Sequence, residues 1–317
     1  MGLSQDIKNK AFELGFHAVG ITTAEPIDSA YIQAIIRWIE QNHHAGLKYM
    51  SKNLEKRFHP ALYLKKARSV ICVAIQYKPP RLPSSKAQIA HFALYEDYHP
   101  FIKERLNRLA EYIQTQLPAG YQWHYKAAVD TAPLAERALA QRAGLGFIGK
   151  NHMLIHPALG CQILLGQLVT TLELPADQPL QTDGCKECDL CLRACPTEAL
   201  SPDGFFLTHR CISYLTQYSD DFAGLDSRVG RRLFGCDVCL LACPYEQNAS
   251  MRQKSELAFY PQRTALEPNQ ILQWTQEQFD QTFAKSCVER IGLEKLKKNA
   301  RICAENERKK QIGEKEV

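Results

Sequence analysis

The sequence lacks the long apolar runs that membrane spans and export signals need. No segment reaches ~18 consecutive apolar residues, and the most apolar stretch, 153–169, is interrupted by His156, Pro157 and two glutamines. The first ten residues, MGLSQDIKNK, contain no apolar core of a signal peptide. These absences argue against a membrane-spanning or exported protein, so we expect a cytoplasmic protein that makes no membrane contact.

Positive and negative charges nearly balance over most of the chain, and the excess of positive charge is concentrated at its end. The net charge is +5, and residues 285–317 hold ten Lys or Arg against six Glu. A basic tail can bind a polyanion such as RNA, although it can equally be a solvated helix. With 317 residues, of which 45% are hydrophobic, the chain can bury the cores of two or three domains.

Residues 1–175 alternate between predicted strands and helices. Four segments are rich in β-branched and aromatic residues, which favours strands: His17–Thr23, Ser69–Tyr77, Gln122–Asp130 and Gly166–Leu174. Two more, Tyr31–Gln41 and Phe101–Leu117, read as helices, and the second places apolar residues at helical spacing. This alternation is typical of an α/β layered domain.

The character of the chain changes twice after this domain. Over 176–250 the periodicity weakens while cysteine, proline and glycine become frequent, which indicates a segment that folds around a metal centre. Residues 251–317 read as helical again. We therefore expect three parts: an α/β domain (1–175), a cysteine-rich domain (176–250) and a helical C-terminal region with a basic tail (251–317).

Twelve cysteines are the most unusual feature of the composition. In a reducing compartment, clustered cysteines indicate metal or redox chemistry rather than disulfides. The bacterial ferredoxin run, C-x2-C-x2-C-x3-C-P, occurs once in full: Cys185, Cys188, Cys191 and Cys195. A second motif has the last three members of the run, and an upstream cysteine can supply the first: Cys211, Cys236, Cys239 and Cys243.

Eight thiolates at this spacing suffice for two four-iron (4Fe-4S) clusters. In two-cluster ferredoxins the cysteine before the proline ligates the other cluster. The crossed pattern assigns one set of ligands as Cys185, Cys188, Cys191 and Cys243, and the other as Cys195, Cys211, Cys236 and Cys239. Two zinc sites are the alternative, but structural zinc has no use for a third, regularly spaced cysteine. We expect the remaining cysteines to be small buried residues: Cys72, Cys161, Cys287 and Cys303.

The run Gly144-Leu-Gly146-Phe-Ile-Gly149-Lys150 matches a dinucleotide fingerprint and most of a phosphate loop. Both sites need a strand before the glycines and a helix after them. Here a helix is predicted before them, from Pro133 to Ala143, so Gly144 reads as its C-terminal cap. We expect the glycines to allow close approach of a flat ligand instead.

Asp130 ends a predicted strand, just before that helix. Ligands of α/β domains collect at the carboxyl ends of strands, and a partly desolvated carboxyl there can donate a proton. The alternative is that Asp130 or Thr131 only caps the helix. Arg137, together with Tyr98 and His99, can reach the same pocket.

Taken together, these segments resemble the epoxyqueuosine reductase family. The resemblance rests on four segments and on both cysteine motifs, and runs along nearly the whole chain. The segments are Asp97-Tyr98-His99, Asp130-Thr-Ala-Pro133-Leu-Ala-Glu136-Arg137, Ala143-Gly-Leu-Gly-Phe-Ile-Gly-Lys-Asn151 and Gly292-Leu-Glu-Lys-Leu-Lys-Lys-Asn299-Ala300. Many members carry a further C-terminal helical-repeat extension, whereas this chain stops soon after Asn299.

The resemblance implies a fold, a reaction and cofactors. The family combines a nitroreductase-like, cobalamin-binding α/β (α+β) domain with a two-cluster ferredoxin-like domain. It reduces the epoxide of epoxyqueuosine in the tRNA anticodon loop to the alkene of queuosine, using base-off cobalamin and two 4Fe-4S clusters. The D-x-H-x-x-G cobalamin signature is absent, which fits a family without a histidine below the cobalt.

Residue roles also follow from the resemblance. Asp130 would be the proton donor, with Tyr98, His99 and Arg137 on the substrate side. Cobalamin contacts would come from Arg57, Asp130, Leu154 to His156, Ser213 and Cys236 with Asp237. We expect a monomer that receives single electrons from a flavodoxin or ferredoxin. The alternatives are a small-molecule reductase of the reductive dehalogenase type and a ferredoxin-type electron carrier without catalysis.

Overall fold

The computed structural model describes residues 2–80, 82, 85, 87–182, 184–250 and 256–313. Its central sheet has the strand order β1-β2-β7-β4, and every neighbouring pair is antiparallel. The strands are β1 (Ala18–Thr23), β2 (Ser69–Gln76), β7 (Ile163–Thr170) and β4 (Tyr125–Ala128). All four predicted strands are present, with their ends shifted by up to four residues.

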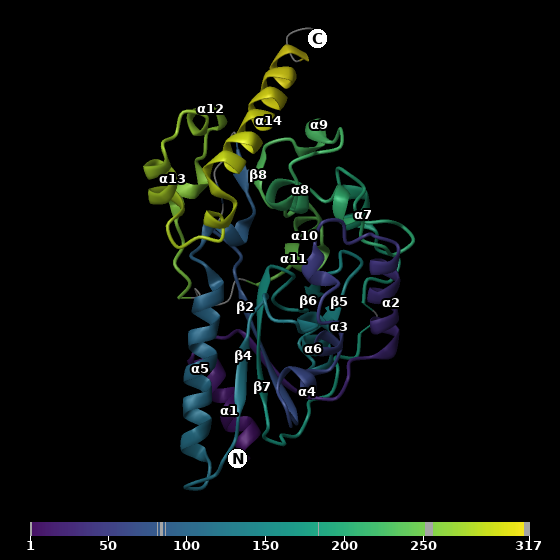
Figure 1. Cartoon of the computed structure of the whole chain (residues 1–317), viewed down its shortest axis with the longest axis vertical. Coiled ribbons are helices and arrows are strands. Elements are labelled where there is room, and N and C mark those ends of the chain that lie inside the picture. Colours follow the sequence, from purple (N-terminus) through teal and green to yellow (C-terminus); the bar gives the residue numbers. More distant parts are fainter. Residues whose placement is uncertain are drawn as a thin grey trace.

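Helices cover both faces of this sheet, which explains why β2 is buried at every position (Figure 1). One face packs against α1 (Leu3–Glu13) and α5 (Tyr98–Gln116). The other packs against α2 (Ser29–Glu40), α3 (Leu54–Phe58), α4 (Pro60–Tyr63) and α6 (Glu136–Arg142). This arrangement confirms the α/β (α+β) fold class. The carboxyl-edge rule that singled out Asp130, however, belongs to parallel sheets and does not apply to this antiparallel one.

The cysteine-rich part contains only short elements, as its weak periodicity suggests. They are α7 (Leu190–Ala194), η3 (Thr208–Arg210), α8 (Ile212–Tyr218), α9 (Asp226–Val229), β8 (Arg232–Phe234), α10 (Val238–Leu241) and α11 (Pro244–Gln247). Their apolar clusters are small. Burial of apolar side chains therefore contributes less here than in the sheet domain, and metal ligation would have to contribute more.

The C-terminal region does not pack as a separate unit. Its elements are η4 (Pro261–Thr264), α12 (Pro268–Ile271), α13 (Gln276–Phe283), η5 (Glu289–Ile291) and α14 (Gly292–Gly313). They share a core with η2 (His91–Leu94) and with β3 (Gln88–Ile89), which pairs in parallel with β8. The buried guanidinium of Arg263 joins the two segments by donating to the carbonyls of Tyr95 (2.6 Å) and Ala284 (3.0 Å).

The glycine run after α6 closes that helix. Gly144 has φ +79°, and its N–H and that of Leu145 donate to the carbonyls of Gln141 and Ala140, both at 3.0 Å. This is a Schellman cap, so the predicted role of Gly144 is confirmed. At Gly146 the close neighbour is the chain itself and not the expected flat ligand, because a Cβ on Gly146 would lie 2.2 Å from the carbonyl oxygen of Ile155. The close approach at Gly146 is thus made by the chain's own β5–β6 hairpin (Phe147–Ile148, Leu154–Ile155).

The C-terminal end of α14 projects beyond the rest of the molecule (Figure 1). Its last turns carry exposed basic side chains at Arg308, Lys309 and Lys310. Within the described ranges, no helix combines the length and apolar character that a membrane span requires.

Candidate functional site

The motif cysteines gather in two groups. The first group lines a cavity together with Lys150, Asn151 and Tyr245. Its thiols come from both motifs: Cys185, Cys188, Cys191 and Cys243. These are the four residues that the crossed ferredoxin pattern predicts for one cluster. Their arrangement around a shared space is what a cubane cluster requires of its ligands.

The second group lies among β8 and the short helices α8 and α10. Its members are Cys195, Cys211, Cys236 and Cys239, and the charges of these thiols act on one another. Cys211 stands at the N-terminal end of α8, and Cys236 directly follows Gly235 after β8. The structure therefore brings the displaced Cys211 to the second motif, which sequence spacing could only suggest.

The donor sets fit iron–sulfur clusters better than zinc. All twelve cysteines are free of disulfides. Four thiols around one cavity, three of them from a single C-x2-C-x2-C run, suit a multi-iron cube, whereas structural zinc uses paired cysteines around one atom. The other cysteines, Cys72, Cys161, Cys287 and Cys303, are buried, as predicted.

Asp130 lies two residues beyond β4 in a left-handed conformation, with φ +51°. Its backbone N–H donates to Oε1 of Glu136 at 2.8 Å, and its carboxylate Oδ2 lies 3.3 Å from Nε2 of His99. The capping alternative is wrong, because α6 begins at Glu136 and its N-cap, Ala135, has no side-chain cap. The side chain of Asp130 is 62% exposed, so the protein alone does not desolvate it as expected.

His99 lies between two carboxylates. Its Nδ1 is 2.6 Å from Oδ1 of Asp97, which also caps α5 by accepting the His99 N–H at 2.9 Å. Burial would lower the pKa of His99, but hydrogen bonds with Asp130 and Asp97 outweigh burial and raise the pKa to about 9. The imidazole is therefore a cation at neutral pH, held between Asp97 and Asp130.

Tyr98 and Arg137 contact residues next to Asp130 and do not bind its carboxylate. The ring of Tyr98 stacks on His99 with centroids 4.2 Å apart, and burial raises the pKa of its hydroxyl well above the usual range. Arg137 donates to the carbonyl of His152 rather than to Asp130. Burial, together with the charge of Arg137, lowers the pKa of His152 to about 4, so its imidazole is neutral.

The expected cobalamin contacts come from several elements of the fold. Arg57 is buried near Glu136 and Arg137 and donates to the carbonyl of Tyr49 at 3.2 Å. Its Nε has no hydrogen-bond partner among the described residues. Ser213 lies on α8 and accepts from Gln217 at 2.6 Å.

Two further expected contacts lie on and directly after β6 (Leu154–Ile155). Leu154 is packed in the core cluster beneath α6. His156 accepts two backbone N–H groups, at 3.1 and 3.2 Å, inside its own turn.

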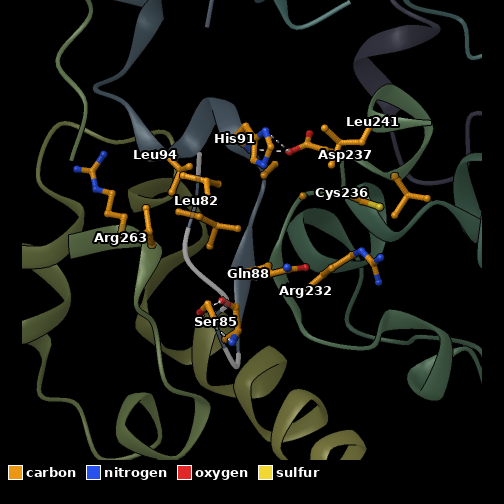
Figure 2. A pocket seen from close by; sticks show the side chains of 16 residues that line it. Leu82, Ser85, Gln88, His91, Leu94, Arg232, Cys236, Asp237, Leu241 and Arg263 are labelled. Carbon is orange, nitrogen blue, oxygen red and sulfur yellow. Dashed lines mark hydrogen bonds and ion pairs between the residues drawn. The ribbon is translucent and has the colours of Figure 1, made fainter. Parts of the chain in front are cut away.

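Asp237 faces a separate pocket beside the second cysteine group. Its carboxylate accepts the backbone N–H of His91 at 2.6 Å, and the His91 ring meets the amide of Gln162 at 2.7 Å. Figure 2 shows His91, Asp237 and Cys236 around this pocket, with Arg232 on the same side. The pocket thus adjoins a predicted cluster ligand.

Three residues at the site escaped the sequence analysis. Tyr49 and Tyr218 are 52% and 49% exposed. Partial burial and the nearby Tyr218 and Asp130 side chains raise the pKa of the Tyr49 hydroxyl to about 12. The guanidinium carbon of Arg290 lies 4.7 Å from the centroid of the Tyr218 ring, and its charge also reaches Asp97. No motif marks these residues, which come from three distant parts of the chain.

Two family models match the chain. Residues 57–131 match the model described as "Epoxyqueuosine reductase QueG, DUF1730". Residues 184–246 match a "4Fe-4S double cluster binding domain". The first range contains Asp97, His99 and Asp130, and the second contains all eight motif cysteines.

Curated relatives extend the similarity to nearly the whole chain. The epoxyqueuosine reductase of Leadbetterella byssophila is 35% identical over 93% of this chain and 96% of its own length. That of Pseudomonas aeruginosa is 34% identical over 95% of this chain and 84% of its own length. The chain therefore matches relatives of two lengths.

Solved structures agree with the sequence relatives. The Streptococcus thermophilus epoxyqueuosine reductase superposes with a TM-score of 0.86 at 32% identity, over 96% of this chain and 82% of that one. An epoxyqueuosine reductase crystallised with an epoxyqueuosine-modified tRNA stem loop also has a TM-score of 0.86, at 28% identity, over 95% of this chain and 80% of that one. The Bacillus subtilis enzyme, solved with its catalytic aspartate loop swung out of the active site, has a TM-score of 0.85 at 27% identity, over 95% and 80%. The similarity to these relatives over nearly the full length shows that the chain belongs to the epoxyqueuosine reductase family, and the two groups of four thiols and the Asp97–His99–Asp130 arrangement agree with this.

Proposed function

We propose that this protein reduces the epoxide of epoxyqueuosine, in the anticodon loop of a tRNA, to the alkene of queuosine. The observation that carries the proposal is the near full-length kinship with epoxyqueuosine reductases, which spans both the Asp130 region and the cysteine motifs. The reaction consumes two electrons and two protons and releases the epoxide oxygen as water.

Asp130 is the proposed proton donor to the departing oxygen, because an alkoxide is a poor leaving group unless it is protonated. Its carboxylate is oriented by His99, 3.3 Å away, which is in turn held by Asp97. The imidazolium between the two carboxylates can return a proton to Asp130 after each turnover. Asp97, His99 and Asp130 thus form a short path along which a proton reaches the site.

The residues present fit the cofactors of the family. Bound cobalamin and two 4Fe-4S clusters would supply the two-electron reducing chemistry and the stepwise delivery of electrons. The two groups of four thiols would hold the clusters. The unpartnered Nε of buried Arg57 marks a place where a polar group of a ligand would complete its hydrogen bonding. Arg57, which donates to the carbonyl of Tyr49, and Ser213, which shares α8 with Tyr218, would hold cobalamin.

A single-stranded RNA loop suits the surface around Asp130. Loops are bound by stacking unpaired bases on aromatic rings and guanidinium planes and by pairing phosphates with basic side chains. Tyr49, Tyr218 and Arg290 provide such a surface, and the basic end of α14 would contact the tRNA backbone.

The working cycle also needs an electron source and a mobile loop. The proposed donor is a flavodoxin or ferredoxin, and the proposed setting is a monomer in the cytoplasm. Because the B. subtilis relative has its aspartate loop swung out, we propose that the loop of Asp130 likewise has an inward and an outward position.

Anaerobic protein, reconstituted with iron, sulfide and cobalamin, tests the function. The expected result is conversion of an epoxyqueuosine-containing stem loop to queuosine with a chemical reductant, together with spectra of 4Fe-4S clusters and base-off cobalamin. Turnover of a halogenated compound but not of the stem loop would instead indicate a small-molecule reductase. Clusters without cobalamin binding or turnover would indicate an electron carrier.

A further inference from the structure

Two non-glycine residues beside the site adopt a left-handed backbone conformation. Asp130 has φ +51° and His152 has φ +60°. L-residues avoid this region, and such conformations persist only where neighbouring contacts maintain them. The contacts that maintain these two can therefore be sought in the residues around them.

Consecutive side chains in the first turn of α6 make those contacts. Glu136, the first residue of the helix, accepts the backbone N–H of Asp130 at 2.8 Å through Oε1. Arg137, the next residue, donates to the backbone carbonyl of His152. The first turn of α6 thus hydrogen-bonds the main chain of both strained residues, and the Asp130 carboxylate remains available to face His99.

Partial burial of the Glu136 carboxyl costs desolvation free energy, which argues that its contact with the Asp130 N–H has a structural role. The side chain is only partly exposed, and burial together with the charge of Asp130 raises its pKa to about 8. An ordinary first-turn glutamate on a helix points to water, where it interacts favourably with the helix dipole without desolvation. In its neutral form Glu136 still accepts the Asp130 N–H through its carbonyl oxygen.

We propose that Glu136 is a positioning residue, whose side chain holds the backbone of Asp130 and so keeps the 129–135 loop in the inward position with the carboxylate toward His99. The inference rests on the proposed function for its catalytic meaning, but the hydrogen bond itself can be measured without turnover. Arg137 plays the matching part for His152 on the facing segment.

The first test is amide hydrogen exchange at Asp130 in the cluster-loaded protein. Glu136→Ala removes the acceptor, whereas Glu136→Gln keeps a carbonyl oxygen at the same reach. We expect exchange at Asp130 to quicken roughly tenfold or more in Glu136→Ala and to stay near the wild-type rate in Glu136→Gln. Exposed Glu111 on α5 supplies the control, since Glu111→Ala should leave this amide unchanged.

The second test separates positioning from a general loss of structure. Glu136→Ala should lower kcat by roughly tenfold to a hundredfold with little change in KM, and Glu136→Gln should restore most of the loss. In an Asp130→Asn background, Glu136→Ala should add almost nothing, because Glu136 acts through Asp130.

The outcomes also distinguish this inference from the proposed function. Equal exchange at Asp130 in Glu136→Ala and wild type, or an additive loss in the double variant, would overturn the positioning role. Wild-type protein that fails to turn over, while Glu136→Ala still loosens the Asp130 amide, would overturn the proposed function and leave the hydrogen bond established.

Discussion

Nε2 of His99 lies 3.3 Å from Oδ2 of Asp130, while Nδ1 of the same ring lies 2.6 Å from Oδ1 of Asp97. The two aspartates are 33 residues apart, and the ring joins them across the N-terminal end of α5. A cationic imidazole in this position orients the Asp130 carboxylate and supplies the next proton.

Replacing the proposed donor tests this relationship directly. Asparagine tolerates the left-handed conformation of Asp130, so Asp130→Asn should fold and keep both clusters. It has no acidic proton to give, so we expect kcat on the modified stem loop to fall by about 10²–10⁴. Wild-type turnover in this variant would remove Asp130 from the mechanism, and Glu111→Ala serves as the folding control.

A second prediction concerns how the contribution of His99 to folding stability depends on pH. Its folded pKa of about 9 lies above the reference value of 6.5, so its contribution is fully present below pH 6.5 and is lost as pH rises through about 9. His99→Gln should therefore lower the Tm of the loaded protein clearly at pH 6 and hardly at all at pH 10. An equal difference in Tm at the two pH values would show that the ring is not held as a cation.

The crossed cluster ligands can be tested by counting iron. Cys185→Ala with Cys243→Ala removes two ligands of one proposed cluster, so iron should fall from about eight atoms per chain to about four. Cys185→Ala with Cys239→Ala removes one ligand from each of the two clusters, so nearly all iron should be lost.

The uncrossed assignment predicts a different result for the first pair, since Cys185 and Cys243 would then belong to separate clusters. Loss of both clusters in that variant would show that the ligands are not crossed. Cys161→Ala serves as control, because Cys161 is buried beside the first group but is not among its four predicted ligands.

The aromatic surface predicts an effect on binding rather than on chemistry. Tyr218→Ala should weaken binding of an unmodified anticodon stem loop by about 1–3 kcal/mol, roughly 5- to 150-fold in Kd. Tyr218→Phe keeps the ring and should bind nearly as the wild type does. Tyr121 is equally exposed, at 49%, so Tyr121→Ala is a matched control, and a similar loss in both alanine variants would refute a specific surface.

Local patterns predicted the elements well and their contacts poorly. The four sheet strands and the helices α2, α5 and α6 follow from residue type and periodicity, whereas α1, α3 and α4 were not predicted. The Schellman cap at Gly144 follows from the helix before it. The antiparallel pairing does not follow, since alternating helices and strands are compatible with either strand direction. The alternative, a helix cap at Asp130 or Thr131, was wrong for a similar reason: proximity to α6 in sequence did not reveal that the helix begins only at Glu136.

What the sequence by itself determined is the chemistry of the cysteines. Ligand spacing within a motif is a property of a short stretch of chain, so it survives without knowledge of the fold. The tertiary structure alone decided the geometry around Asp130, because His99, Glu136, Tyr49 and Arg290 approach it only once α5, α6, η1 (Lys48–Met50) and η5 have packed. Side chains that meet by packing leave no periodic trace in the order of residues.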